Sequence, residues 1–201
     1  MPVDWRSVPM PPPVARLPRN TAGRPVPRAT PWFEVGPDGS QLRPARNADL
    51  GLYADCPCEP GRGTAAFGQQ CPNAQRDLMT GRACGVCAKP IKETSLLVFV
   101  GGPGNGAYTE PPLHQRCCAY ALRVCPKLAA QPDVEVAVTR TYTLVERRMT
   151  GVDTAGELLY DFFVFRDPAA RAAGVLDFYL ALPDRPQRTN ARTWLEQQPP
   201  Q

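Results

Sequence analysis

Cysteine and histidine side chains occur in two pairs whose spacing is typical of zinc ligands. Two residues separate Cys84 from Cys87, and two residues separate His114 from Cys117. Zn²⁺ binds four such side chains in a tetrahedron, with sulfur at about 2.3 Å and imidazole nitrogen at about 2.0 Å. His114 is the only histidine in the sequence. The pattern therefore predicts a zinc site formed by Cys84, Cys87, His114 and Cys117.

The local sequence around each pair suits a shared metal ion. Gly85 lies between the first two cysteines, and we expect it to allow a turn with positive φ. His114 and Cys117 are three residues apart, so on a helix their side chains share one face. Cys118 is the alternative to Cys117, because it follows His114 by about one turn. Four protein ligands fill the coordination shell, which favours a structural zinc ion over a catalytic one. The occurrence of both pairs in one short stretch favours a metal site over buried cysteines without metal.

Three more cysteines, Cys56, Cys58 and Cys71, lie upstream in a stretch rich in glycine and proline. They form a second zinc site if a fourth ligand comes from elsewhere, so the sequence predicts one zinc ion and allows two. Cys118 and Cys125 are seven residues apart on an expected helix, about 10 Å along its axis. One ion cannot easily bind both, so we interpret these two cysteines as core residues.

The segment between the two ligand pairs has the pattern of a β-hairpin. Residues 91–100 end in an apolar run and predict a strand, the glycine-rich residues 101–106 predict a turn, and residues 107–109 predict the returning strand. A helix is expected over residues 114–124, where a proline follows it. This order of elements is that of a treble-clef zinc finger, which we expect at about residues 82–128.

The rest of the chain predicts an α+β fold. Residues 1–30 are rich in proline and should form an extended arm without helix. One zinc-stabilised domain is expected over residues 31–182, followed by a polar tail at residues 183–201 in which Trp194 is a candidate for docking. The other expected elements are a hairpin at 31–42, a short helix at 72–79, strands at 133–145 and 157–165, and a C-terminal helix at 169–182.

Composition bears on the location and the partners. The sequence shows no apolar secretory segment near Met1, and its longest apolar run, residues 96–100, is far too short to cross a membrane. We therefore expect a cytoplasmic protein with reduced, zinc-bound cysteines and no membrane partner. The net charge of +4 allows nucleic-acid contact without requiring it.

The sequence contains no recognisable catalytic set. Its only histidine is assigned to zinc, which leaves no general base for a nuclease of the HNH type or for a Cys-His or Ser-His-Asp hydrolase. Glu93, Glu110 and Asp161 are candidates for carboxylate chemistry, but their spacing does not indicate a pair. We therefore expect that the protein is not an enzyme.

Several short motifs carry a resemblance to known sequences. They lie at residues 23–27, 32–33, 82–87, 110–117, 123–126 and 138–142. With these motifs the chain resembles a group of uncharacterised proteins encoded by actinobacteria and their phages, over most of residues 15–182. The resemblance implies a bacterial or phage origin and a zinc site, and it implies no activity.

Three function classes stay open at this point. The first is a non-enzymatic zinc-binding module that acts through protein or nucleic-acid contacts, with a protein partner expected. The others are an HNH-like or other metal-dependent nuclease and a structural component of a larger assembly. Arg116 and Arg123 on the ligand-bearing helix are the candidates for phosphate contacts. Trp32 and Phe33 are expected in the core and not on a base-stacking surface.

Overall fold

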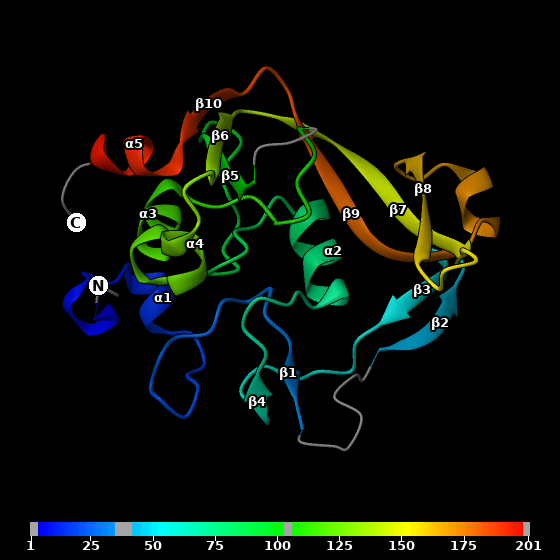
Figure 1. Cartoon of the computed structure of the whole chain (residues 1–201), viewed down its shortest axis with the longest axis horizontal. Helices are drawn as coiled ribbons and strands as arrows, with labels where there is room; N and C mark the ends of the chain where they lie inside the picture. Colours follow the sequence, from blue (N-terminus) through cyan, green and yellow to red (C-terminus); the bar gives the residue numbers. More distant parts are fainter. Residues whose placement is uncertain (1–3, 35–41, 103–105, 199–201) are drawn as a thin grey trace.

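Three β-sheets and several short helices make up the described part of the chain, residues 4–34, 42–102 and 106–198 (Figure 1). This computed structural model confirms the expected α+β class. The largest sheet has the strand order β2-β3-β9-β7-β8, formed by Arg43–Asn47, Gly51–Asp55, Val175–Pro183, Tyr142–Val152 and Leu158–Val164. The second has the order β10-β6-β5, formed by Gln187–Asn190, Glu135–Thr139 and Leu97–Gly101. The third pairs β1 with β4, formed by Trp32–Phe33 and Thr64–Ala65.

The two longest helices begin and end where the sequence provides caps. α2 (Pro72–Thr80) has Cys71 as its N-cap and Gly81 as its C-cap. α3 (Gln115–Val124) has His114 as its N-cap and ends just before a proline that starts α4. Both helices agree with the expectation from sequence. The remaining helices are α1 (Pro12–Ala15), α4 (Pro126–Ala130), α5 (Ala191–Glu196) and the 3-10 helices η1 (Trp5–Ser7) and η2 (Pro168–Ala172).

The single strand expected at residues 133–145 is divided between two sheets. β6 belongs to the three-stranded sheet, whereas β7 begins at Tyr142 and crosses the five-stranded sheet. The Thr139 hydroxyl donates to the Asp184 carbonyl at 2.6 Å and lies 3.0 Å from the Thr141 carbonyl, which fixes the chain where it leaves the first sheet. The return from β7 into β8 forms the expected hairpin.

The prediction of a C-terminal helix at residues 169–182 is wrong. Asp167 does cap a helix with proline in its first turn, but this is the short η2, and the chain turns at Gly174 with a φ of 65°. A Cβ at Gly174 would lie 2.2 Å from the Met149 carbonyl oxygen, so only glycine fits this turn. β9 then pairs with β7 on one side and β3 on the other. Pairing with two distant strands overrides the local helical pattern.

The prediction of a hairpin between the two ligand pairs is also wrong. Strand β5 starts only at Leu97, and it pairs with β6 in place of residues 107–109. Tyr108 instead bridges to Ala181 of β9, and Leu113 bridges to Val98 on the free side of β5. The returning segment is therefore shared between two sheets. The cysteine turn and the ligand-bearing helix of the treble-clef expectation are present, without its own hairpin.

The first strand of the hairpin expected at residues 31–42 pairs with a later segment of the chain. β1 pairs with β4, so Trp32 faces Ala65. The turn and second arm that the sequence predicted, residues 36–41, lie outside the described residues. Trp32 is 4% exposed, which places its ring in the interior as expected.

The two ends of the described chain pack on the domain. The N-terminal segment contains η1 and α1, which contradicts the expectation of an arm without helix, and it buries Val8, Val14 and Val26. Segments with fixed proline φ start helices readily when a following turn can form. At the other end β10 pairs with β6, and α5 buries Trp194. Residues 183–198 therefore form structure and are not a polar tail.

Buried polar side chains join α2 to the strands. The Gln75 amide nitrogen donates to the carbonyls of Thr109 and Tyr179, at 2.8 and 2.7 Å, and its oxygen accepts from the Tyr179 N–H at 3.1 Å. The Arg76 guanidinium donates to the carbonyls of Asp177 and Ala54. Side chains of α2 thus form hydrogen bonds with backbone groups that have no partner in a neighbouring strand.

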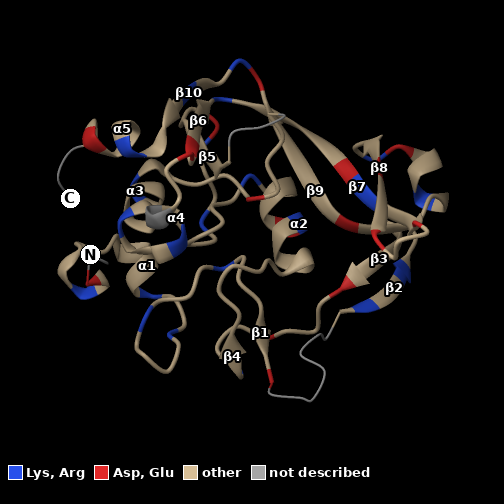
Figure 2. Ribbon diagram, viewed as in Figure 1, with Lys and Arg blue, Asp and Glu red and all other residues tan. Residues whose placement is uncertain are grey.

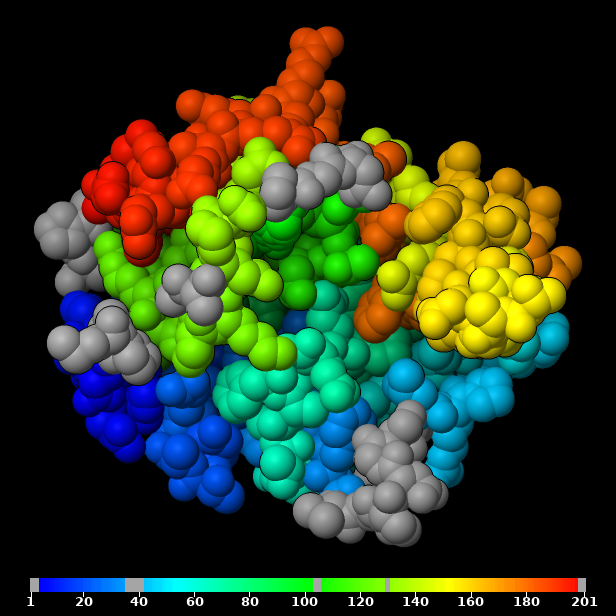
Figure 3. Space-filling view, viewed as in Figure 1, coloured from blue at the N-terminus to red at the C-terminus, as the bar shows by residue number. Residues whose placement is uncertain are grey.

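Charged residues of both signs are interspersed over the elements (Figure 2). On β7 a buried ion pair joins Arg148 to Glu146 at 2.7 Å, and the arginine also donates to the Leu50 carbonyl. The β7–β8 hairpin lies at one end of the molecule, where its residues gather on the surface in yellow and orange (Figure 3). The Arg148 guanidinium therefore links β7 to the backbone at the start of β3, through the carbonyls of Leu50 and Leu52.

We predict that Gln75→Leu destabilises the protein by about 2–4 kcal/mol, because it removes the hydrogen bonds of three backbone groups, two of them buried. Urea unfolding followed by circular dichroism measures this change. Gln69→Leu is the matched control, since Gln69 is exposed, and it should change stability by less than about 0.5 kcal/mol. Equal stabilities for the two variants would contradict this role of Gln75.

Candidate metal centre

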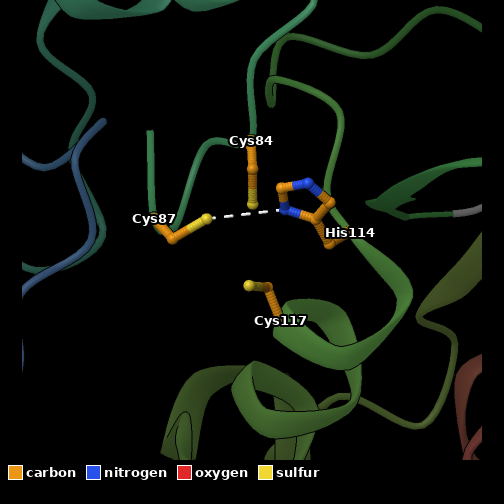
Figure 4. Close-up of side chains that lie close together, drawn as sticks. All are labelled: Cys84, Cys87, His114 and Cys117. Atoms are coloured by element: carbon orange, nitrogen blue, oxygen red, sulfur yellow. Dashed lines mark hydrogen bonds between the residues drawn. The ribbon is translucent and has the colours of Figure 1, made fainter. Parts of the chain in front are cut away.

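The first pair of predicted ligands lies on a tight turn between α2 and β5. The Ala88 N–H donates to the Cys84 carbonyl at 2.8 Å, and the Cys84 N–H donates to the Lys89 carbonyl at 3.0 Å. Ala88 adopts a left-handed conformation with a φ of 60°. These bonds wrap the chain so that the sulfurs of Cys84 and Cys87 point to the same side (Figure 4).

Gly85 does not adopt the positive φ that we expected of it. Its backbone instead lies against another segment, since its N–H donates to the Pro112 carbonyl at 2.9 Å. A Cβ at this position would lie 3.2 Å from the Pro111 Cβ. Glycine is therefore needed for a close approach of two chain segments, and Ala88 provides the left-handed turn.

The second pair lies at the N-terminus of α3. His114 precedes the first helical residue and Cys117 is in the first turn, so both side chains face the cysteine turn (Figure 4). The four ligand atoms of Cys84, Cys87, His114 and Cys117 all lie within 4.8 Å of one another. The structure thus brings together all four ligands predicted from the sequence, as a group that could hold a metal ion.

The two nitrogens of His114 have different surroundings. Nδ1 lies 3.4 Å from the Cys87 sulfur, and Nε2 lies 3.3 Å from the Pro90 carbonyl oxygen. A ring that donates Nε2–H to this carbonyl keeps Nδ1 free to bind a metal. The Pro90 carbonyl was missed by sequence reasoning, because a backbone oxygen carries no signature in the residue types.

The electrostatics of the group suit a bound cation. Hydrogen bonds from Cys117 lower the pKa of Cys87, and hydrogen bonds with Cys84 raise the pKa of Cys117. Hydrogen bonds with Cys84 also raise the pKa of His114 to about 10. Protons must therefore remain among these side chains unless a positive ion replaces them. A divalent metal ion bound by neutral imidazole and thiolates removes this conflict.

Cys84 has no exposed surface, and Cys87 and Cys117 are also buried. On the outer side, Pro11–Pro13 line the same cavity of about 470 Å³ as His114 and Cys117. The N-terminal segment therefore lies beside the group and limits solvent access to it.

The two remaining cysteines near α3 stand apart from the four ligands. Cys118 is fully buried in the core, where desolvation raises its pKa, and it is not part of the group. Cys125 is half-buried at the start of α4. Cys117 and not Cys118 therefore faces the cysteine turn.

Cys56, Cys58 and Cys71 form a second group, with sulfurs within 4.8 Å of one another. The Cys58 thiol donates to the Cys71 sulfur at 3.5 Å, and the Cys71 sulfur also accepts from the Ala74 N–H at 3.4 Å. The hydrogen bond from Cys56 lowers the pKa of Cys71 to about 6, and in return the pKa of Cys56 is raised. This group too could hold a metal ion.

A short chain of backbone hydrogen bonds connects the two groups. The Cys71 N–H donates to the Ala29 carbonyl at 2.8 Å, and the Ala29 N–H donates to the Gly85 carbonyl at 3.1 Å. The Arg28 N–H donates to the Val86 carbonyl at 3.0 Å. One turn of the N-terminal segment thus fixes the position of the cysteine turn relative to α2.

The carboxylates considered for catalysis lie on separate elements. Glu110 is exposed at the edge of a largely apolar cavity of about 460 Å³. Glu93 precedes β5, and Asp161 lies on β8 opposite Arg148. A polar pocket of about 630 Å³ lies between α2, β3 and β9, with Arg76 in its wall. The structure does not assemble the expected candidates into an acid–base pair.

No helix among the described residues has the length and apolar character that crossing a membrane requires. Comparison with known protein families, with curated proteins and with solved structures finds no match to this chain.

Proposed function

We propose that this chain is a non-enzymatic zinc-binding module, in which the metal fixes a surface for contact with a protein partner. The observation that supports it most is the closed set of Cys84, Cys87, His114 and Cys117 in the core. Three thiolates and one imidazole make a donor set typical of structural zinc, with no position left for a reacting water. Zinc would hold the cysteine turn against α3 and so stabilise the fold.

The second group fits a second zinc ion. Cys56 follows β3, Cys58 lies two residues on, and Cys71 caps α2. Zinc at these three sulfurs would tie the start of α2 to the end of β3. The chain would then carry two ions, joined through the hydrogen bonds of Ala29.

A protein partner is supported by the outer face of the β7–β8 hairpin. Phe162 is 59% exposed and Val164 is 71% exposed, and Leu158 and Val152 are exposed beside them. Apolar residues gathered on one surface are typical of sites that bind other proteins. The bacterial or phage origin implied by the sequence resemblance, and a role within a larger assembly, are compatible with such a surface.

Nucleic-acid binding has weaker support. On the same face the Arg147 guanidinium pairs with Asp177 at 2.7 Å and lies over the rings of Tyr160 and Phe178. An arginine held in this way is poorly placed to bind phosphate. A nuclease has weaker support still, because the only histidine faces the metal group.

We predict two zinc ions per chain in the purified protein and one in His114→Ala, measured by mass spectrometry of metal content. The histidine variant should also unfold at a lower temperature while it keeps its second ion, because binding of a structural zinc ion contributes to the free energy of folding. A chelator applied to the wild type should likewise lower the unfolding temperature.

The matched control for this experiment is Cys118→Ala, which changes the neighbouring buried cysteine that faces away from the group. It should keep both ions and lose only about 1–2 kcal/mol of stability through the small cavity. Full metal content in His114→Ala would contradict the assignment of the first site.

We predict that tagged protein captures a partner from its host, and that Phe162→Lys lowers the affinity at least about 30-fold, equivalent to about 2 kcal/mol. The exposed position of Phe162 means that stability should change by less than about 0.5 kcal/mol. Phe67→Lys is the matched control, since Phe67 is an exposed phenylalanine in the loop before α2, away from the β7–β8 hairpin. Undiminished capture by Phe162→Lys, or salt-sensitive electrophoretic shifts of nucleic acid, would argue against this surface.

A further inference from the structure

The second cysteine group differs from the first in the number of ligands that the chain can supply. Three sulfurs converge, and two of them, those of Cys56 and Cys71, belong to buried residues. Cys58 is only half-buried, and an exposed loop at residues 59–63 follows it. The group therefore has an interior side formed by two sulfurs and an outer side at Cys58.

No fourth cysteine or histidine is available in this chain. Of its eight cysteines and one histidine, three cysteines and the histidine belong to the first group and three cysteines to the second. The remaining two are Cys118, which is fully buried in the other core cluster, and Cys125, which starts α4. Among the described residues no aspartate or glutamate oxygen joins the three sulfurs either. Asp55 and Glu59 flank Cys56 and Cys58 in sequence, but Asp55 accepts a hydrogen bond from Asn73 and Glu59 pairs with Arg62.

We propose that a zinc ion held by Cys56, Cys58 and Cys71 keeps one exchangeable coordination position, at which an external ligand with a sulfur or aromatic nitrogen donor binds. The inference rests on the proposed occupancy of the second group. Zinc prefers four ligands, and sites with three protein ligands hold solvent or a substrate in the fourth position.

The exchange involves no redox change. Solvent leaves the zinc ion as the external ligand binds, and a thiol gives up its proton to the buffer because only the thiolate binds the metal. An imidazole binds through its neutral nitrogen and needs to lose no proton. The half-buried side of the group at Cys58 is where such a ligand can approach. A free small molecule and the side chain of a partner protein share this donor chemistry.

Cobalt substitution tests the proposal on the full chain. Protein produced in medium supplemented with cobalt should contain two Co²⁺ ions, whose visible absorption reports the ligands. Addition of imidazole or 2-mercaptoethanol should change this spectrum in a saturable way, while the metal content measured afterwards stays at two ions. The small probes test the position itself, and a cysteine-containing or histidine-containing peptide tests a protein source of the same donors.

Two variants show which ion responds. Cys58→Ser should bind one ion and lose the spectral response, whereas Cys125→Ser removes a half-buried cysteine outside both groups and should keep both ions and the response. Should Cys58→Ser fail to fold, the wild-type spectrum alone decides, because the first group has no position for the probe.

Two ions with no response to either probe would overturn the open position and show that a further protein ligand closes the site. One ion that is lost in His114→Ala would overturn the second site and leave the proposed function intact. No bound ion in the wild type would overturn both.

Discussion

Thiol side chains packed into a protein interior create an electrostatic problem that governs this fold. Cys84, Cys87 and Cys117 are buried beside His114. Hydrogen bonds between the sulfurs lower the pKa of Cys87 and raise the pKa of Cys117, so a second ionised sulfur would repel the first. Apolar packing alone does not relieve this repulsion, whereas one divalent ion does. A metal ion that binds these side chains would therefore stabilise the contact between the cysteine turn and the start of α3.

Backbone contacts extend this constraint to the rest of the molecule. Ala29 lies between the two cysteine groups and bonds to Gly85 on one side and Cys71 on the other. α2 begins at that second group and carries Gln75, which satisfies backbone groups of β9. Hydrogen bonds thus fix the cysteine turn to Ala29, Ala29 to the start of α2, and α2 to the large sheet. Even the exposed β7–β8 hairpin depends on it, because β9 pairs with β7.

Sequence reasoning succeeded where short-range rules decide the structure. Caps and prolines fix both ends of α2, and residue spacing alone brought Cys84, Cys87, His114 and Cys117 together. It failed where distant segments compete for the same chain. Residues 169–182 have apolar residues at helical spacing, yet most of them form β9, which pairs between β3 and β7. No local feature of the sequence predicts that pairing. The Pro90 carbonyl beside the histidine ring is likewise placed by the fold and not by a residue type.

The two cysteine groups also differ in how closed they are, and the difference follows from their places in the fold. The first draws ligands from a turn and a helix that face each other across the core, so four donors surround one point. The second lies where β3 runs into a surface loop, and only the Cys71 end of α2 approaches from inside. One side of that group is left to solvent at Cys58, which is half-buried. A closed centre suits a purely structural ion, whereas a centre with an outer side can serve both the fold and an external ligand.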